Sequence, residues 1–141
     1  MPLKANDTDG AVSRKRVESY VAASEKVTAV AGTNAVAPTA DQLLNSKLFV
    51  VTPTEDTTFT LPTAANVLAA LTDEAVGTSF EFTIVNLASA FEIVVTTNTG
   101  WTITNGGFMT VFDGTSATFL AVVTSTTAIQ LYRKNSGGAV K

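Results

Sequence analysis

The sequence predicts an all-β fold: an antiparallel β-sandwich or jelly-roll-like barrel of about seven or eight strands, with one short helix and an extended N-terminal arm. Three observations lead to this prediction. Short stretches that alternate apolar and polar residues recur at near-regular spacing after residue 46. Turn sequences rich in glycine and asparagine separate them. Threonine, which favours strands, supplies 24 of the 141 residues. We therefore expect an arm at 1–46, a β-sandwich domain at 47–133 and a C-terminal tail at 134–141.

The first part of this domain is expected to contain two strands and the helix. The strands are predicted at 47–52 and 57–61, on either side of a turn at 53–56. Pro62 suits the first helical position because its φ is fixed and it has no N–H, and residues 64–71 favour a helix. One face of this helix would carry Val67, Leu68 and Leu71.

The clearest alternation follows Gly77, in residues 79–86. It puts an apolar set on one face, Phe80, Phe82 and Ile84, and Glu81 and Thr83 on the other. Residues 91–97 repeat the pattern, with Phe91, Ile93 and Val95 pointing inward. The remaining strands, separated by turns at 98–100, 105–107 and 113–114, are expected at 101–104, 108–112, 116–124 and 128–133.

Charge is distributed unevenly along the chain. The 85 residues between Lys47 and Arg133 contain no lysine or arginine and seven acidic residues, which gives a formal charge of −7. These acidic residues are Glu55, Asp56, Asp73, Glu74, Glu81, Glu92 and Asp113. Nucleic-acid recognition draws on lysine and arginine, so we expect no nucleic-acid partner. An uncharged, threonine-rich β surface instead favours contact with other proteins.

The absence of two residue types also narrows the function. Histidine and cysteine do not occur, which removes the commonest general base, the commonest zinc ligand and any thiolate metal site. We expect no enzymatic activity, no cofactor and no metal. The longest aliphatic run, residues 67–71, is too short to span a bilayer. We expect no membrane partner, and synthesis in the cytoplasm.

The arm differs in composition from the domain. Residues 12–24 could form a short helix with Val17, Tyr20 and Val21 on one side and Arg14, Lys15 and Arg16 at its start. Residues 27–38 have low complexity and cannot build a core of their own. A disordered terminus is one interpretation. We favour an arm ordered by neighbouring subunits, in which Arg14, Lys15, Arg16, Val17, Tyr20 and Val21 contact a partner.

One aromatic residue is a candidate for ligand contact. Trp101 follows Gly100, and an exposed indole there could stack on a sugar ring, with Asn98 and Asn105 at the contact. The competing interpretation is that Trp101 fills the core or an interface, which is the commoner role of a single tryptophan in a strand.

The carboxylates offer two further candidates. The pairs Glu55–Asp56 and Asp73–Glu74 could contribute oxygen ligands to Ca²⁺, although solvated turns are the simpler interpretation. Glu81 and Glu92 lie on strands expected to be neighbours and could serve a glycosidase. Alternation places both on the polar face, so a solvated sheet surface is the better interpretation.

Five segments of the chain resemble a β domain that recurs in virion proteins of tailed bacteriophages. They are residues 38–44, 57–64, 77–86, 114–120 and 128–133. The resemblance implies a component of the virion surface, such as a capsid decoration (cement) protein or a head or tail fibre, commonly a homotrimer. It implies no catalytic residues. The N-terminal 37 residues lie outside it.

Two functions follow as expectations. In the first, the protein decorates the capsid surface: the β domain forms a trimeric knob, and the arm runs across neighbouring copies of the major capsid protein. In the second, the β domain is a receptor- or carbohydrate-binding tip on a fibre, with Trp101 at the contact. A hydrolase that uses Glu81 and Glu92 is a third and weaker hypothesis.

Overall fold

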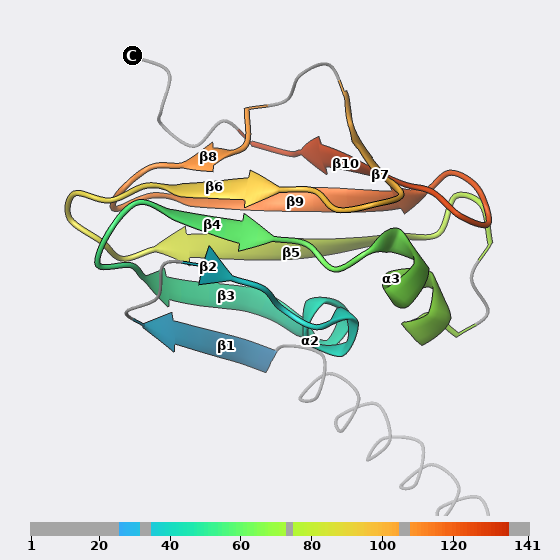
Figure 1. Ribbon diagram of the computed structural model, residues 1–141, viewed down its shortest axis with the longest axis horizontal. Coiled ribbons are helices and arrows are strands. Elements are labelled where there is room, and N and C mark those ends of the chain that lie inside the picture. The colour runs from blue at the N-terminus through green and yellow to red at the C-terminus, as the bar shows by residue number, and fades with distance from the viewer. Residues whose placement is uncertain (1–25, 32–34, 73–74, 105–107, 136–141) are drawn as a thin grey trace, which may run out of the picture.

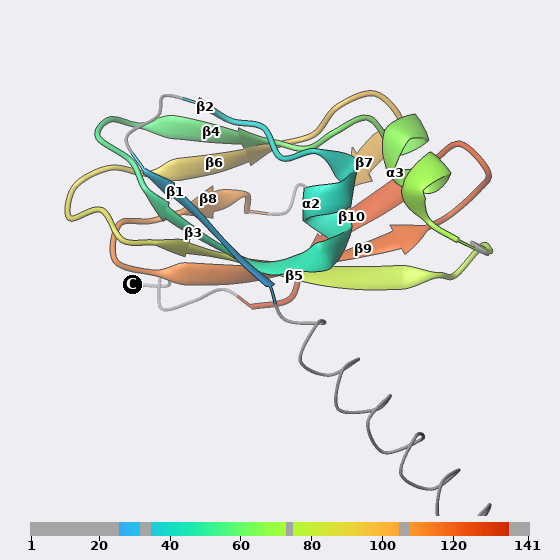
Figure 2. The ribbon, with the colours of Figure 1, turned by 90° about the horizontal axis from the view of Figure 1, so that it is seen from below.

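Two β-sheets pack face to face in the computed structural model, which describes residues 26–31, 35–72, 75–104 and 108–135 (Figures 1 and 2). The six strands of the large sheet are, in spatial order, β1 (Lys26–Ala31), β3 (Ser46–Thr52), β5 (Ser79–Asn86), β9 (Ser116–Val123), β10 (Ile129–Arg133) and β7 (Trp101–Ile103). The four strands of the small sheet are β2 (Ala35–Val36), β4 (Thr57–Thr60), β6 (Ile93–Thr96) and β8 (Thr110–Val111).

The chain crosses from one sheet to the other after almost every strand. As a result β1, β3 and β5 are parallel neighbours in the large sheet, and β2, β4 and β6 are parallel neighbours in the small sheet. The first six strands therefore wind as a flattened coil. The later strands close it: β8 and β9 pair antiparallel with β6 and β5, and β10 lies antiparallel to β9 and parallel to β7.

The expected antiparallel β-sandwich is therefore wrong. The fold is mixed α/β, with two mixed sheets, mostly parallel pairs and two short helices. The turn at 53–56 illustrates the observed connections. It carries the chain from β3 in the large sheet to β4 in the small sheet, so the two strands that it joins do not pair with each other. The same residue types form turns within one sheet and turns that lead to the opposite sheet. The sequence of a turn therefore does not tell which of the two it makes.

The two helices lie together at one end of the sandwich (Figures 1 and 2). Helix α3 (Ala64–Ala70) was expected, but it begins later than predicted, because Thr63 caps it through a 3.2 Å bond from the backbone N–H of Asn66 and Pro62 precedes the cap. Helix α2 (Ala40–Asn45) was not expected. Its signal was present in the sequence, since Thr39 and Gln42 form a reciprocal capping box.

The expected boundary between arm and domain does not coincide with a boundary in the sheets. Strand β1 pairs with β3 over its full length, and β2 pairs with β4. Residues 26–45, assigned from sequence to the arm, thus contribute two strands and a helix to the fold. The low-complexity stretch at 27–38 builds no core of its own, but it adds edge strands to sheets formed by later residues.

Four phenylalanines form the centre of the core between the sheets. Phe82 stacks on Phe119 with ring centroids 5.4 Å apart and on Phe59 at 6.2 Å. Phe49 meets Phe59 edge-on at 5.1 Å. Three of these rings come from the large sheet and Phe59 comes from the small sheet, so the cluster joins the two layers. The predicted inward face of residues 79–86 is confirmed, because Phe80, Phe82 and Ile84 are all buried.

Candidate interaction surfaces

The outer face of the large sheet is unusually apolar for a surface. We call it the apolar sheet face and define it by the residues Val27, Ala29, Leu48, Val50, Val85, Leu120, Val122 and Tyr132, all half-buried or exposed. The strand registers place these side chains side by side, as in the row Ala29, Val50 and Val85. At its margin Glu81 and Lys134 form a 2.6 Å ion pair.

This face has the pattern of a sheet that is covered on both sides. Strands β3, β5 and β9 alternate between buried inward residues and half-buried or exposed outward ones. The outward aliphatic residues lie beside the hydrogen-bonded hydroxyls of Thr83 and Thr118. Parallel sheets whose strands carry apolar residues on both faces normally have a layer packed on each face. Contiguous exposed apolar surface of this kind marks a site of protein contact. The apolar sheet face is therefore the first candidate site.

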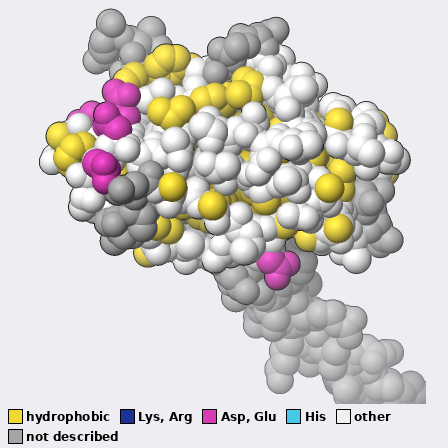
Figure 3. All heavy atoms as spheres, viewed as in Figure 1, with side chains coloured by type: hydrophobic (Ala, Val, Ile, Leu, Met, Phe, Trp, Pro, Cys, Tyr) yellow, Lys and Arg dark blue, Asp and Glu magenta, His cyan; other side chains and the backbone are white. Residues whose placement is uncertain are grey.

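The outer face of the small sheet is different: it is uncharged and rich in threonine. Ala35, Thr58, Val94 and Thr110 form one row across its four strands. The hydroxyls of Thr60 and Thr96 are hydrogen-bonded at 2.9 Å in the next row. Figure 3 views this side, and no described lysine or arginine is visible on it, while carboxylates gather at the end where β6 begins.

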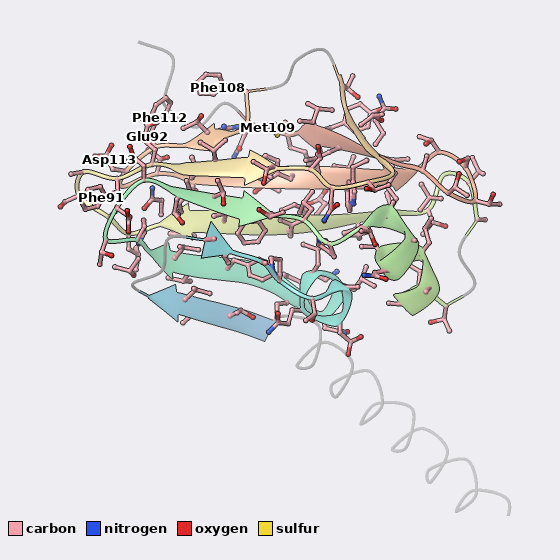
Figure 4. The ribbon with its side chains drawn as sticks, in the orientation of Figure 1. Phe91, Glu92, Phe108, Met109, Phe112 and Asp113 are labelled. Atoms are coloured by element: carbon pink, nitrogen blue, oxygen red, sulfur yellow. The ribbon has the colours of Figure 1, made fainter. Side chains whose placement is uncertain are left out.

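A second candidate site lies at that end, where β8 forms the edge of the small sheet. We call it the aromatic end and define it by Phe108, Phe112, Phe91, Glu92 and Asp113 (Figure 4). The rings of Phe108 and Phe112 are 5.5 Å apart, and Phe108 is 56% exposed. Residues 109 and 111 are buried between them, so the two rings project on the solvent side of the strand.

Carboxylates border these rings. In the antiparallel register Ile93 faces Val111, and the same register carried one residue further sets Glu92 opposite Phe112. Asp113 follows Phe112 in an exposed turn. A third carboxylate, Asp56, accepts a 3.0 Å hydrogen bond from the backbone N–H of Glu92. The aromatic end therefore combines exposed apolar rings with negative charge.

Arg133 holds the aromatic end from the inner side. Its Nη1 donates to the carbonyl oxygens of Phe108 at 2.9 Å and Thr110 at 2.6 Å, and its guanidinium carbon lies 5.8 Å from the centre of the Phe108 ring. Burial lowers the pKa of Arg133 from its ordinary value, but a guanidinium stays protonated at neutral pH. Because Arg133 comes from the large sheet, it fastens the edge of the small sheet to the large one.

Asn86 fixes the same region from the core. It is fully buried, and its amide nitrogen donates to the carbonyls of Phe91 at 2.7 Å and Val111 at 3.0 Å. Its side-chain oxygen accepts a 3.0 Å hydrogen bond from the N–H of Ala88. One buried amide thus joins β5 to the segments on both sides of the aromatic end. The site is preorganised, because its strands are held by contacts that need no ligand.

The residues proposed from sequence for ligand contact have different outcomes in the structure. Trp101 is 7% exposed and its indole N–H donates to the carbonyl of Pro62 at 2.7 Å, so its ring fills the core and offers no stacking surface. Asn98 is exposed, and its side chain accepts a hydrogen bond from the N–H of Thr99. Asn105 lies outside the described residues, as do the arm residues Arg14, Lys15, Arg16, Val17, Tyr20 and Val21.

The two glutamates considered for hydrolysis belong to different sheets. Glu81 lies on β5 of the large sheet and Glu92 directly precedes β6 of the small sheet, so they do not lie on neighbouring strands as expected. Of the pairs considered for calcium, Glu55 and Asp56 are exposed, and Asp73 and Glu74 are outside the described residues. Across the described ranges, no three acidic residues lie close enough together to hold a metal ion.

Comparison with known proteins gives no assignment. A scan of the chain against protein-family models finds no match, and searches of the curated proteins and of the solved structures find none either. Among the helices in the described part of the chain, none is long and apolar enough to cross a membrane.

The exposed pair of phenylalanines at the aromatic end could have been predicted from the sequence, but was not. Residues 108–112 were expected to form a strand, and alternation within it puts Met109 and Val111 on one side and Phe108, Thr110 and Phe112 on the other. In an edge strand one of these two sides faces solvent. Met109 and Val111 face the core, so Phe108 and Phe112 lie on the solvent side.

Proposed function

We propose that this protein is a structural protein of a bacteriophage particle, a capsid decoration protein that lies with its large sheet against the assembled lattice of the major capsid protein. The observation that carries the proposal is the apolar sheet face. Its side chains Val27 and Tyr132 are 58% and 36% exposed. Covering such a face removes apolar area from water at about 25 cal/mol per Å².

No chemical step is needed for this function. A protein that binds the assembled lattice better than free capsid subunits stabilises the lattice by mass action. The absence of lysine and arginine between residues 48 and 132 agrees with a partner that is a protein surface and not a polyanion. The resemblance of five segments to a virion β domain supports the same function, and it adds the expectation of a homotrimer.

The alternative of a carbohydrate-binding fibre tip has less support. It depended on Trp101 as an exposed stacking platform, and that ring is buried. A hydrolase is weaker still, since Glu81 is engaged in an ion pair with Lys134.

Cosedimentation with capsids assembled without this protein tests the proposal. Val50→Lys puts a charge at the centre of the apolar sheet face, where its neighbours in the register are Ala29 and Val85. Val94→Lys is the matched control, because Val94 is an outward valine on the small sheet and 38% exposed. We expect Val50→Lys to weaken capsid binding about tenfold or more, since the lysine would be desolvated in the contact.

The control decides the interpretation. Val94→Lys should bind capsids like the wild-type protein, and both variants should keep the wild-type thermal midpoint within a few degrees, because an outward lysine can extend into water. If wild-type protein does not pellet with capsids, the decoration proposal is wrong. If both variants bind equally well, the large sheet is not the docking face.

A further inference from the structure

We propose that the aromatic end of one copy binds the basic N-terminal segment, residues 14–21, of a second copy of this chain. The proposal concerns self-assembly in solution and needs no capsid. The site offers two neighbouring phenylalanine rings, one of them more than half exposed, with carboxylates at their border. An apolar surface bordered by one sign of charge selects a segment that is both amphipathic and oppositely charged.

The N-terminal segment has this composition. Arg14, Lys15 and Arg16 are three successive positive charges, and they match the three carboxylates Asp56, Glu92 and Asp113 at the site. Residues 14–21 contain one acidic residue, Glu18, against these three basic residues, so the segment keeps a formal charge of +2.

The apolar part of the segment follows the charges directly. Val17, Tyr20 and Val21 have the i, i+3, i+4 spacing that brings side chains together on one face of a helix. That face would pack on the rings of Phe108 and Phe112. Arg133 already lies against Phe108 at 5.8 Å from the inner side, so an incoming arginine would approach the ring from its exposed side.

The positions of the edges favour a second copy over the same copy. The segment is joined to the fold at Lys26, where β1 begins, and β1 is the first strand of the large sheet. The aromatic end flanks β8, which is the last strand of the small sheet, at the opposite edge of the sandwich (Figure 1). A contact from one edge to the opposite edge of the next copy is head-to-tail, and head-to-tail contacts form a closed ring when the rotation between copies closes and an open filament when it does not. The expected homotrimer is one such ring.

Charge reversal in the full-length chain tests the proposal. One variant carries Arg14→Glu, Lys15→Glu and Arg16→Glu, and a second carries Glu92→Lys and Asp113→Lys. Their masses are measured by light scattering over a series of concentrations, together with the wild-type protein. We expect each variant alone to need about tenfold or more protein to assemble. A third variant that carries both sets of substitutions in one chain should assemble again, because each reversed segment then meets a reversed site on the next copy.

The matched control carries Asp41→Lys, which changes the net charge as much as Asp113→Lys alone but lies on α2, away from the aromatic end. It should assemble like the wild-type protein. Thermal unfolding of each variant checks the fold, and if the site double variant is unfolded, Asp113→Lys alone makes the same test from an exposed turn.

Three results would overturn the proposal. A wild-type chain that stays monomeric at all concentrations would mean that no second copy is bound. Reversed variants that assemble as well as the wild-type protein would show that these charges are not at the contact. A variant with both reversals that stays monomeric would exclude pairing between the segment and the site. Capsid binding plays no part in these measurements, so a failure here leaves the decoration proposal to be judged by cosedimentation.

Discussion

Replacing Phe82 with alanine should cost more stability than almost any other single substitution in the domain. Phe82 is 1% exposed and lies between Phe59 and Phe119, with its ring nearly parallel to both, at 13° and 21°. It also meets Phe49 edge-on at 6.4 Å. The substitution removes a ring that contacts both sheets at once.

The size of the effect follows from this position. A buried phenylalanine-to-alanine change costs about 3 to 5 kcal/mol through lost transfer free energy and the cavity that remains. We expect a value near the upper end, about 4 to 5 kcal/mol, because the surrounding strands are paired on both sides and cannot collapse into the space. Three aromatic contacts are lost as well, each worth about 0.5 to 1.5 kcal/mol, part of which is already included.

Urea unfolding followed by circular dichroism measures this cost, with an unchanged m-value as the check that unfolding remains two-state. Phe108→Ala is the matched control: the same atoms are removed from a ring that is 56% exposed, and about 1 kcal/mol or less should be lost. Should Phe82→Ala leave too little folded protein to measure, Phe82→Leu is expected to cost about 1 to 2 kcal/mol. A loss below about 1 kcal/mol for Phe82→Ala would refute the assignment of inward and outward faces on β5.

Two further substitutions test how the aromatic end and the turns are held. Asn86→Ala should cost about 2 to 4 kcal/mol in urea unfolding, because it leaves two buried carbonyls and one N–H without their partner; a near-neutral result would mean that water replaces the amide. Gly100→Ala should cost about 2 to 3 kcal/mol by the same measurement, because φ is +87° and the added Cβ would lie 2.6 Å from that of Ala64. Gly114→Ala, at φ +66° with open space around the Cβ, should cost only about 1 kcal/mol. Equal losses at the two glycines would contradict the close approach at Gly100.

Most strand positions after residue 46 and most inward faces were predictable from sequence, because they depend on neighbouring residues. Strands β1 and β2 were not predicted, and Phe91, which was expected to point inward, is half-buried. The alternation of residues 79–86 predicted the burial of Phe80, Phe82 and Ile84, which the structure confirms. Partner choice depends on residues far apart in the chain. The same alternation in β3 satisfies an antiparallel hairpin and the parallel pairing with β5 that is observed, because either arrangement buries the same side of the strand.

For the aromatic end, too, the features that depend on neighbouring residues were predictable and those that depend on distant residues were not. That Phe108 and Phe112 share a face could be predicted from alternation within five residues. The groups that hold this region could not. The Arg133 guanidinium binds the carbonyl of a residue 25 positions earlier, and the Asn86 amide binds one 25 positions later. Such contacts follow from the order of strands in the sheets, which alternation within single strands does not determine.

The order of strands in the large sheet also bears on how the chain folds as it is synthesised. Strand β5 lies between β3, which precedes it, and β9, which is made some thirty residues later. A growing chain that ends before Ser116 therefore has β5 as an open edge, with unpaired backbone groups beside its inward-facing phenylalanines. Because domains begin to fold from the N-terminus during synthesis, the first coils exist for a time without the strand that completes them. A prematurely terminated chain should be prone to aggregation, and the last strands to leave the ribosome should determine when the protein becomes soluble.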